Sequence, residues 1–152
     1  MTTTIIAFSL ALLAFGFASA PALAEDKFVP STIKSAADYE WQEFAPGTPL
    51  TFVPLWGDRS SDGEYAILLK LPAGFSCGTH AHTHDYHGIN IQGAWVHTDR
   101  VATDEKGLPP GSLVTQPGLS MHADHCKGPE DCILLIYQKG KSDFIPKPKS
   151  AN

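Results

Sequence analysis

Residues 74–93 read GFSCGTHAHTHDYHGINIQG, and four of the seven histidines of the chain fall between His80 and His87. In an extended strand, residues two apart share a face, so His80 and His82 point the same way. Two neighbouring imidazoles are the beginning of a chelate for a divalent metal, and a complete site needs further ligands. The alternative is a solvated polar loop, which the density of histidines and the flanking glycines disfavour.

A second stretch, residues 111–126, reads GSLVTQPGLSMHADHC and carries another histidine at a regular distance from a glycine and a proline. Together the two stretches resemble the cupin family, whose motifs read G-x5-H-x-H-x3or4-E-x6-G and G-x5-P-x-G-x2-H-x3-N. The matching positions are Gly74, His80, His82 and Gly93 in the first stretch and Gly111, Pro117 and His122 in the second. The resemblance implies that His80, His82 and His122 bind one metal ion.

The rest of the chain favours the same fold class. Strands are predicted at residues 65–71, 89–98, 112–116 and 132–138, with glycine and proline turns between them. This pattern predicts a β-sandwich or barrel, and the resemblance implies an all-β jelly-roll barrel, the double-stranded β-helix. The predicted organisation is a signal peptide at 1–24, an irregular segment at 25–50 that packs on the barrel, a cupin domain at 51–144 and a loose tail at 145–152.

The acidic ligand of the family is missing from this chain. Counting three residues past His82 reaches Tyr86, and counting four reaches His87. Strand alternation places His87 on the apolar face with Ile89 and Trp95, so His87 is the predicted fourth ligand. If Asn90 and Gln92 line the pocket instead, Tyr86 faces the metal as a ligand or neighbour. Two smaller departures affect a turn and a packing contact, with Leu119 in place of Gly and Cys126 in place of Asn.

Four further stretches resemble one subgroup of bacterial cupins, the DUF4437-like domains of unknown function. They are LWGD at 55–58, LPAGF at 71–75, HTHDYHG at 82–88 and the DC…QKGKSDF run at 131–144. The resemblance supplies no substrate.

A site of three or four neutral histidines leaves the full positive charge on a bound Fe, Mn, Ni, Cu or Zn ion. Such a centre activates bound oxygen ligands or water, and Asp85 or Tyr86 is the candidate proton acceptor beside it. Asp85 is equally explained as a turn residue, and His84 and His125 are expected to face solvent. The prediction is therefore a small-molecule metalloenzyme of oxygenase or isomerase type. The alternatives are a non-catalytic binding or sensor module with a structural metal, or a barrel that binds a ligand without metal.

The N-terminal 24 residues contain a long apolar run without a charged side chain. The run ends in Ala22-Leu23-Ala24, which fits a signal-peptidase site before Glu25, and Ala20 offers an earlier one. The sequence therefore predicts a periplasmic or secreted protein, although an uncleaved anchor also fits the length of the run.

Export affects the interpretation of the three cysteines, because disulfides persist in oxidising compartments. Cys126 and Cys132 bracket the polar loop KGPED, and we predict a disulfide between them. Cys77 is then left free or paired with an external thiol. A pairing of Cys77 with Cys126 remains open.

Charge excludes two classes of partner. The chain has 11 basic and 16 acidic residues, a net charge of −5, and its basic residues are scattered. Sequence-independent nucleic-acid binding and binding of the mature chain to an anionic membrane both need clustered cations. The expected partner is a small molecule, and the open edges of a β fold also suggest a homodimer.

Overall fold

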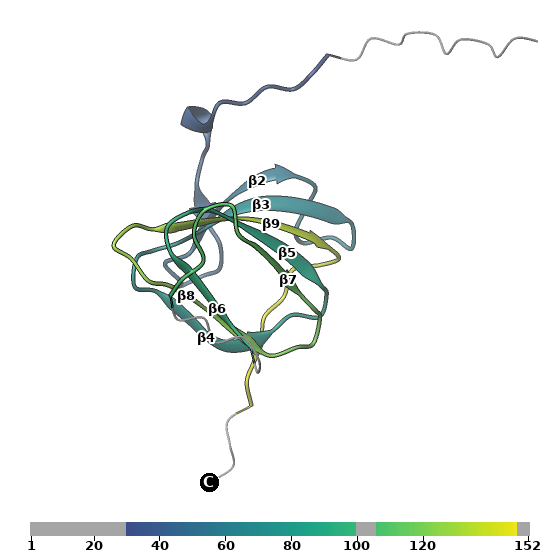
Figure 1. The fold of residues 1–152 in the computed structure, drawn as a ribbon. Coiled ribbons are helices and arrows are strands. Elements are labelled where there is room, and N and C mark those ends of the chain that lie inside the picture. Colours follow the sequence, from purple (N-terminus) through teal and green to yellow (C-terminus); the bar gives the residue numbers. More distant parts are fainter. Residues whose placement is uncertain (1–29, 100–105, 149–152) are drawn as a thin grey trace, which may run out of the picture. The chain divides into compact units, whose positions relative to one another are not determined.

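The fold is seen in a computed structural model that describes residues 30–99 and 106–148 (Figure 1). The predicted signal peptide lies outside the described residues. Two compact units are distinguished, Met1–Ile33 and Lys34–Asn152, and the elements below belong to the second. Within the described residues, no helix is both long and apolar enough to cross a membrane.

In the described part of the second unit, the chain forms a short 3-10 helix and ten strands. The helix η1 spans Ala36–Asp38, and the strands are β1 (Gln42–Glu43), β2 (Thr51–Trp56), β3 (Glu64–Leu71), β4 (Ser76–Ala81), β5 (Tyr86–Gln92), β6 (Trp95–Thr98), β7 (Leu113–Gln116), β8 (His122–Cys126), β9 (Cys132–Lys139) and β10 (Ile145–Pro146).

Two antiparallel sheets face each other, as Figure 1 shows. The larger sheet has the strand order β1-β2-β3-β9-β5-β7, and the smaller one has the order β10-β4-β8-β6. Sequence neighbours such as β3 and β4 or β8 and β9 lie in different sheets, so the chain winds back and forth across the core. This is the jelly-roll arrangement, and it confirms the predicted fold class.

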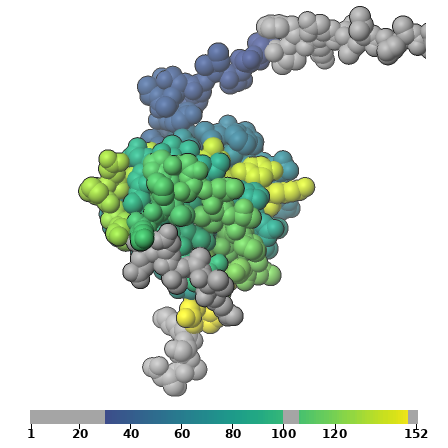
Figure 2. All heavy atoms as spheres, viewed as in Figure 1, coloured from purple at the N-terminus to yellow at the C-terminus, as the bar shows by residue number. Residues whose placement is uncertain are grey.

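The core lies between the sheets, and its side chains come from alternate positions of the strands. In β9, the buried positions are Cys132, Leu134, Ile136 and Gln138, and the residues between them are more exposed. Tyr65, Ile67 and Leu71 of β3 meet them from the neighbouring strand. Side chains fill the space between the ribbons, as the space-filling view shows on the face it presents (Figure 2).

The stretch predicted as one strand at 89–98 is two strands in different sheets. Gly93 turns the chain between β5 and β6 with a φ of 81°, and a Cβ there would meet the backbone oxygen of Asp131 at 2.7 Å. The register of β5 also shifts between Asn90 and Gln92. Strand alternation therefore does not carry through from β5 to Trp95, which begins β6.

A disulfide joins the two sheets at one end of the barrel. Cys126 ends β8 in the smaller sheet, and Cys132 begins β9 in the larger sheet. Their Cα atoms are 5.6 Å apart, and both residues are fully buried. Cys77 carries a free thiol.

The tail predicted to be loose is attached to the barrel as far as it is described. We call residues 140–147 the C-terminal strap. Its strand β10 pairs with β4, with Ile145 opposite Ala81 and Pro146 opposite His80. The Lys147 amide continues this contact by donating to the Thr79 carbonyl at 3.2 Å. The strap therefore lies directly beside the histidine-bearing end of β4.

Candidate metal centre

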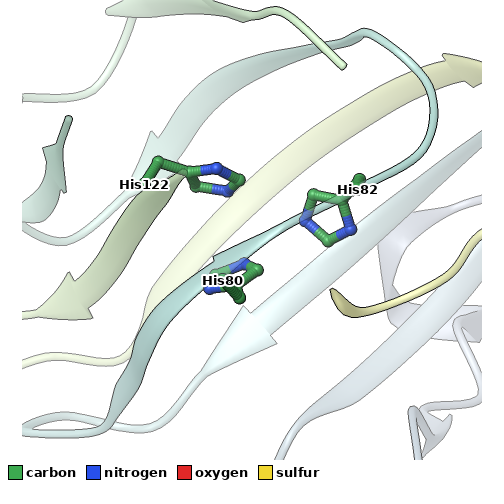
Figure 3. A group of neighbouring side chains, drawn as sticks. All are labelled: His80, His82 and His122. Carbon is green, nitrogen blue, oxygen red and sulfur yellow. The ribbon is translucent and has the colours of Figure 1, made fainter. Parts of the chain in front are cut away.

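Three histidines form the candidate site, and we call His80, His82 and His122 the His cluster (Figure 3). His80 lies in β4 opposite His122 in β8, and His82 follows β4 by one residue. One ring nitrogen of each histidine lies within 4.8 Å of the other two. His80 and His122 are buried, and His82 is half-buried. The β4–β8 register thus brings both motifs to one point.

Backbone carbonyls fix the orientation of all three rings. Nδ1 of His80 lies 2.9 Å from the Gly78 carbonyl oxygen. Nδ1 of His82 lies 2.6 Å from the Asp143 carbonyl oxygen, and Nδ1 of His122 lies 3.1 Å from the Ser120 carbonyl oxygen. A carbonyl oxygen only accepts, so each Nδ1 carries a hydrogen, and in a neutral ring the lone pair then lies on Nε2. In metal-binding histidines, the ring nitrogen that does not bind the metal typically donates a hydrogen bond of this kind.

The buried histidines of the cluster are neutral near pH 7. Burial lowers the pKa of His122 to about 4, against the opposing charge of Asp124. Burial also lowers the pKa of His80. A histidine must be unprotonated to bind a metal, so the environment favours the binding form.

Asp124 is a buried carboxylate beside the cluster, and the sequence analysis did not identify it. Its Oδ1 accepts hydrogen bonds from Trp95 Nε1 (2.8 Å) and His97 Nδ1 (2.9 Å). Its Oδ2 lies 3.5 Å from Nε2 of His122 and 3.8 Å from Nε2 of His80. Burial raises the pKa of Asp124, but the hydrogen bond and charge of His97 outweigh it and lower the pKa overall. Alternation along the strand would have found Asp124, because it lies two residues after His122.

His97 is a buried imidazolium that neutralises Asp124. Its Nε2 lies 3.1 Å from Oε1 of Gln116, whose amide nitrogen donates to the carbonyls of Pro117 and Ser120. Both partners of the ring are therefore acceptors, and both ring nitrogens must donate. Burial lowers the pKa of His97, but the hydrogen bond and charge of Asp124 raise it further than burial lowers it.

Tyr86 faces the cluster from β5. The side chain is buried, and its hydroxyl lies 3.3 Å from Nε2 of His122. Burial raises the pKa of Tyr86 well above its usual value, and the nearby carboxylate of Asp124 adds to the effect. Tyr86 is therefore a neutral phenol at the position that faces the site.

The prediction of His87 as fourth ligand is wrong. His87 is exposed on the outer face of β5, where its Nδ1 lies 3.1 Å from the Thr115 hydroxyl and its ring stacks on Tyr137. The prediction assigns the inner face of this strand by alternation from Trp95, which is buried. The turn at Gly93 places Trp95 in the other sheet, so its burial says nothing about the faces of β5. The inward face of β5 is instead formed by Tyr86, Gly88 and Asn90.

Asp85 and the remaining histidines lie outside the cluster. Asp85 is exposed, and its Oδ1 accepts a hydrogen bond from the Gly118 amide at 2.6 Å, so it joins two turns. The ring of His84 lies against Gly140 of the C-terminal strap. His125 is half-buried, with Nδ1 3.1 Å from the Phe75 carbonyl oxygen. Of the two residues predicted beside the metal, Tyr86 therefore faces the cluster and Asp85 does not.

A cavity of about 90 Å³ adjoins the His cluster inside the barrel. His80, His82, Tyr86 and Asp124 are among the residues that line it. Most other lining side chains are apolar, among them Leu50, Ile67, Leu71, Trp95, Leu134 and Ile136. Cys77 also lines the cavity, and burial raises the pKa of its thiol to about 12.

The C-terminal strap holds one side of the site. The Asp143 backbone binds His82, while its carboxylate accepts hydrogen bonds from the amide and hydroxyl of Thr83. The ring of Phe144 stacks on His80, with centroids 4.5 Å apart and planes 18° apart. Phe144 also lines the cavity and is half exposed, so it lies where the cavity meets solvent.

Solved structures share this fold at low sequence identity. An RmlC-like cupin from Ralstonia eutropha JMP134 is 23% identical, with a TM-score of 0.60 over 76% of this chain and 73% of that one. The polyketide cyclase RemF from Streptomyces resistomycificus is 14% identical, with a TM-score of 0.65 over 80% and 88%. The DMSP lyase DddQ from Ruegeria pomeroyi is 18% identical, with a TM-score of 0.60 over 76% and 64%. At these identities, the likeness shows the fold alone.

The family comparison covers most of the chain. No curated protein matches this chain. A family model described as "Domain of unknown function (DUF4437)" matches residues 33–152. The jelly-roll topology and the cupin structures agree with this match. The chain therefore belongs to the DUF4437 family, and it has the fold of these cupin structures.

Proposed function

We propose that this protein is a small-molecule metalloenzyme that holds one divalent transition metal, Fe, Mn, Ni, Cu or Zn, in the His cluster. One observation carries the proposal. Each of the three imidazoles donates its Nδ1 hydrogen to a backbone carbonyl, which leaves Nε2 of each neutral ring as the metal-binding atom, and one ring nitrogen of each histidine lies within 4.8 Å of the other two. Fixed, convergent lone pairs suit a cation and have no evident purpose in a purely structural core.

The donor set limits the kind of metal. Imidazole nitrogens suit first-row transition ions, whereas Ca²⁺ and Mg²⁺ prefer oxygen ligands. When bound, such an ion polarises a coordinated oxygen and lowers the pKa of coordinated water. Oxygenase or isomerase chemistry fits this centre, because Tyr86 supplies a neutral hydroxyl beside it and no exposed acid lies in the cavity lining.

The cavity indicates the class of substrate. Its walls are mostly apolar, and the polar groups that line it include His80, His82 and Tyr86. A fitting molecule is small and largely apolar, with one oxygen-bearing end directed at the cluster. Tyr86 then donates a hydrogen bond to that oxygen, and Phe144 contacts the molecule at the solvent side.

Elemental analysis tests the proposal. The untagged mature protein is purified from its native compartment beside the His80→Ala/His122→Ala double variant. The matched control is His87→Ala, which removes an exposed histidine outside the cluster. We expect about one equivalent of metal in the wild type and the control, and its loss in the double variant. Equal, substoichiometric metal in all three proteins contradicts a metal centre and leaves a barrel that binds its ligand without metal.

Turnover separates the enzyme from a binding module. Small carbonyl and hydroxyl compounds with apolar bodies are incubated with the metal-loaded protein, and products are followed by mass spectrometry. Conversion that His122→Ala abolishes supports the enzyme. A compound that binds tightly and is recovered unchanged favours the non-catalytic sensor.

We infer that the protein works in the periplasm or outside the cell. The apolar N-terminal run that ends in Ala22-Leu23-Ala24 supports export, and the Cys126–Cys132 disulfide suits an oxidising compartment. N-terminal sequencing of protein from a periplasmic fraction tests this inference. A mature chain that starts at Glu25 supports it, and a chain that keeps its first residues in the cytoplasmic fraction contradicts it.

We also expect a homodimer in solution. Ile89, Ile91 and Leu113 are exposed side by side on the outer face of β5 and β7. Strand β7 is also the edge of the larger sheet. An apolar patch beside an open edge favours pairing with a second copy. Light scattering that gives the mass of one chain contradicts this expectation.

A further inference from the structure

The site contains an acid that the family motif does not predict. Tyr86 and His87 occupy the two positions where the family places its acidic ligand. Asp124 instead comes from β8, where it shares a face with His122 and is buried among the cluster histidines. A carboxylate this deeply buried is costly unless a cation or hydrogen-bond donors compensate it.

Hydrogen bonding does not explain why Asp124 approaches the cluster. Its Oδ2 lies 3.5 Å from Nε2 of His122 and 3.8 Å from Nε2 of His80. In the neutral rings that bind a metal, both Nε2 atoms lack a hydrogen, because each ring carries its hydrogen on Nδ1 and donates it to a backbone carbonyl. Three lone-pair atoms that face one another repel unless a positive ion lies between them.

The spacing of these three atoms suits a shared ion. Ligands at about 2.1 Å from a metal lie about 3.0 Å apart at right angles and about 3.4 Å apart in a tetrahedron. The observed separations of 3.5 and 3.8 Å are slightly longer. A contraction of a few tenths of an ångström would bring Oδ2 of Asp124 to such a separation from each of the two Nε2 atoms.

The other half of the carboxylate is already anchored. Trp95 and His97 both donate to Oδ1, and His97 is itself held by Gln116. These contacts stop the carboxylate from turning, so Oδ2 stays directed at the cluster. An oriented carboxylate of this kind is built like a metal ligand with its supporting groups.

We propose that Asp124 is the carboxylate ligand of this centre and binds the metal through Oδ2, with His97 as its positioning residue. The assignment rests on the proposed metal site. It replaces a donor set of three neutral nitrogens by one with an added anionic oxygen, supplied from the second motif. The bound metal is then less positive by one charge than a centre of histidines alone.

Cobalt binding tests the assignment. The metal-free mature protein is titrated with Co²⁺, and affinity, stoichiometry and the visible absorption spectrum are recorded. Asp124→Asn keeps the size of the side chain but removes the anionic oxygen. Asp131→Asn is the matched control, because Asp131 binds the Ala73 amide away from the cluster. We expect about 100-fold weaker binding and an altered spectrum for Asp124→Asn, and wild-type behaviour for the control.

The variants separate the two proposals. Asp124→Asn with wild-type affinity and spectrum, while His122→Ala loses Co²⁺, overturns the role of Asp124 and leaves the His cluster intact. Absence of Co²⁺ binding in the wild type itself overturns both. If circular dichroism shows that Asp124→Asn is unfolded, a crystal structure of the Co²⁺-bound wild type decides. An Oδ2 atom within about 2.2 Å of the ion supports the assignment, and a longer separation refutes it.

A variant of His97 tests positioning separately. His97→Ala frees one side of the carboxylate but leaves Oδ2 and the cluster in place. We expect about tenfold weaker Co²⁺ binding, with a wild-type spectrum once the site is saturated. A spectrum changed at saturation would show that His97 does more than orient Asp124.

Discussion

The two faces of β5 reverse the usual pattern of a half-buried strand. Its inner face carries Tyr86, Gly88 and Asn90, a phenol, a hydrogen and an amide. Its outer face carries His87, Ile89 and Ile91, and the two isoleucines are exposed. Hydrophobicity alone therefore assigns the faces wrongly. The inner residues are needed for particular contacts: Tyr86 meets the cluster, Gly88 makes room, and Asn90 binds backbone groups.

The largest expected effect is the difference in alkylation rate between the thiol of Cys77, which lines the cavity, and an exposed thiol on the outer face. Burial disfavours the charged thiolate, so a pKa of about 12 instead of 9.0 leaves about 1,000-fold less thiolate at pH 8. Alkylation of Cys77 by iodoacetamide should be slower by that factor than alkylation of an exposed thiol. Its rate should also keep rising with pH beyond 9, because the thiol is still mostly protonated there.

The comparison thiol is placed on the outer face. A Cys77→Ser/Leu113→Cys variant carries it on β7, where Leu113 is 62% exposed. Mass spectrometry follows both reactions. Similar rates for Cys77 and the outer thiol at pH 8 would contradict the raised pKa of the Cys77 thiol.

Asn90→Ala should destabilise the fold by about 2–4 kcal/mol. The buried amide of Asn90 donates to the carbonyls of Gly93 (2.9 Å) and Leu108 (2.7 Å), and its loss leaves both oxygens without that donor. Gln92→Ala is the control, because its amide donates to the Asp131 carbonyl at 3.2 Å from an exposed position. Water replaces that bond, so we expect about 0.5 kcal/mol. Urea denaturation measures both, and equal losses would refute the difference.

Gly88→Ala should cost about 1–3 kcal/mol. A Cβ at Gly88 would lie 2.8 Å from Cη2 of Trp95 and 3.3 Å from Cδ1 of Ile136, so the core must shift. Gly63→Ala provides a control, because its Cβ would meet only the Ser61 hydroxyl at 3.4 Å. Thermal unfolding compares the two, and a melting temperature for Gly88→Ala as high as that of Gly63→Ala would mean that the core has spare room.

Ile91→Thr gives the smallest expected effect on the fold. Ile91 is 48% exposed, and threonine keeps the branched shape suited to a strand, so stability should change by no more than about 0.5 kcal/mol. The same substitution, combined with Leu113→Thr, should weaken the expected homodimer. Denaturation measures the first effect and sedimentation the second. A large loss of stability in the monomer would mean that the outer face is part of the core.

The His cluster could be predicted because the motif fixes both spacing and strand. His80 and His82 follow from alternation, and His122 from the second stretch. The fourth position could not be predicted, since it depends on whether the chain turns at Gly93. A glycine in a strand pattern is compatible with both a turn and a bulge. Once the turn is known, Trp95 no longer fixes the faces of β5, and Tyr86 faces inward.

Some of the groups that contact the His cluster could also be predicted from the sequence, and others could not. Asp124 lay within reach of the sequence, because alternation from His122 places it on the inner face. The hydrogen-bond partner of His82 could not be predicted, because Asp143 lies in a lysine- and proline-rich tail with no strand pattern. The contact depends on how β10 crosses β4, and no local pattern encodes that pairing.

The C-terminal strap has a consequence for how the protein is made. The carbonyl of Asp143 orients His82, so the His cluster cannot take its final form until the chain has emerged beyond that residue. Synthesis of the sheets precedes completion of the cluster, and a chain cut short before the strap would be a nearly whole barrel with a misoriented ligand. A change that disturbs the pairing of β10 with β4 would likewise disturb the orientation of His82.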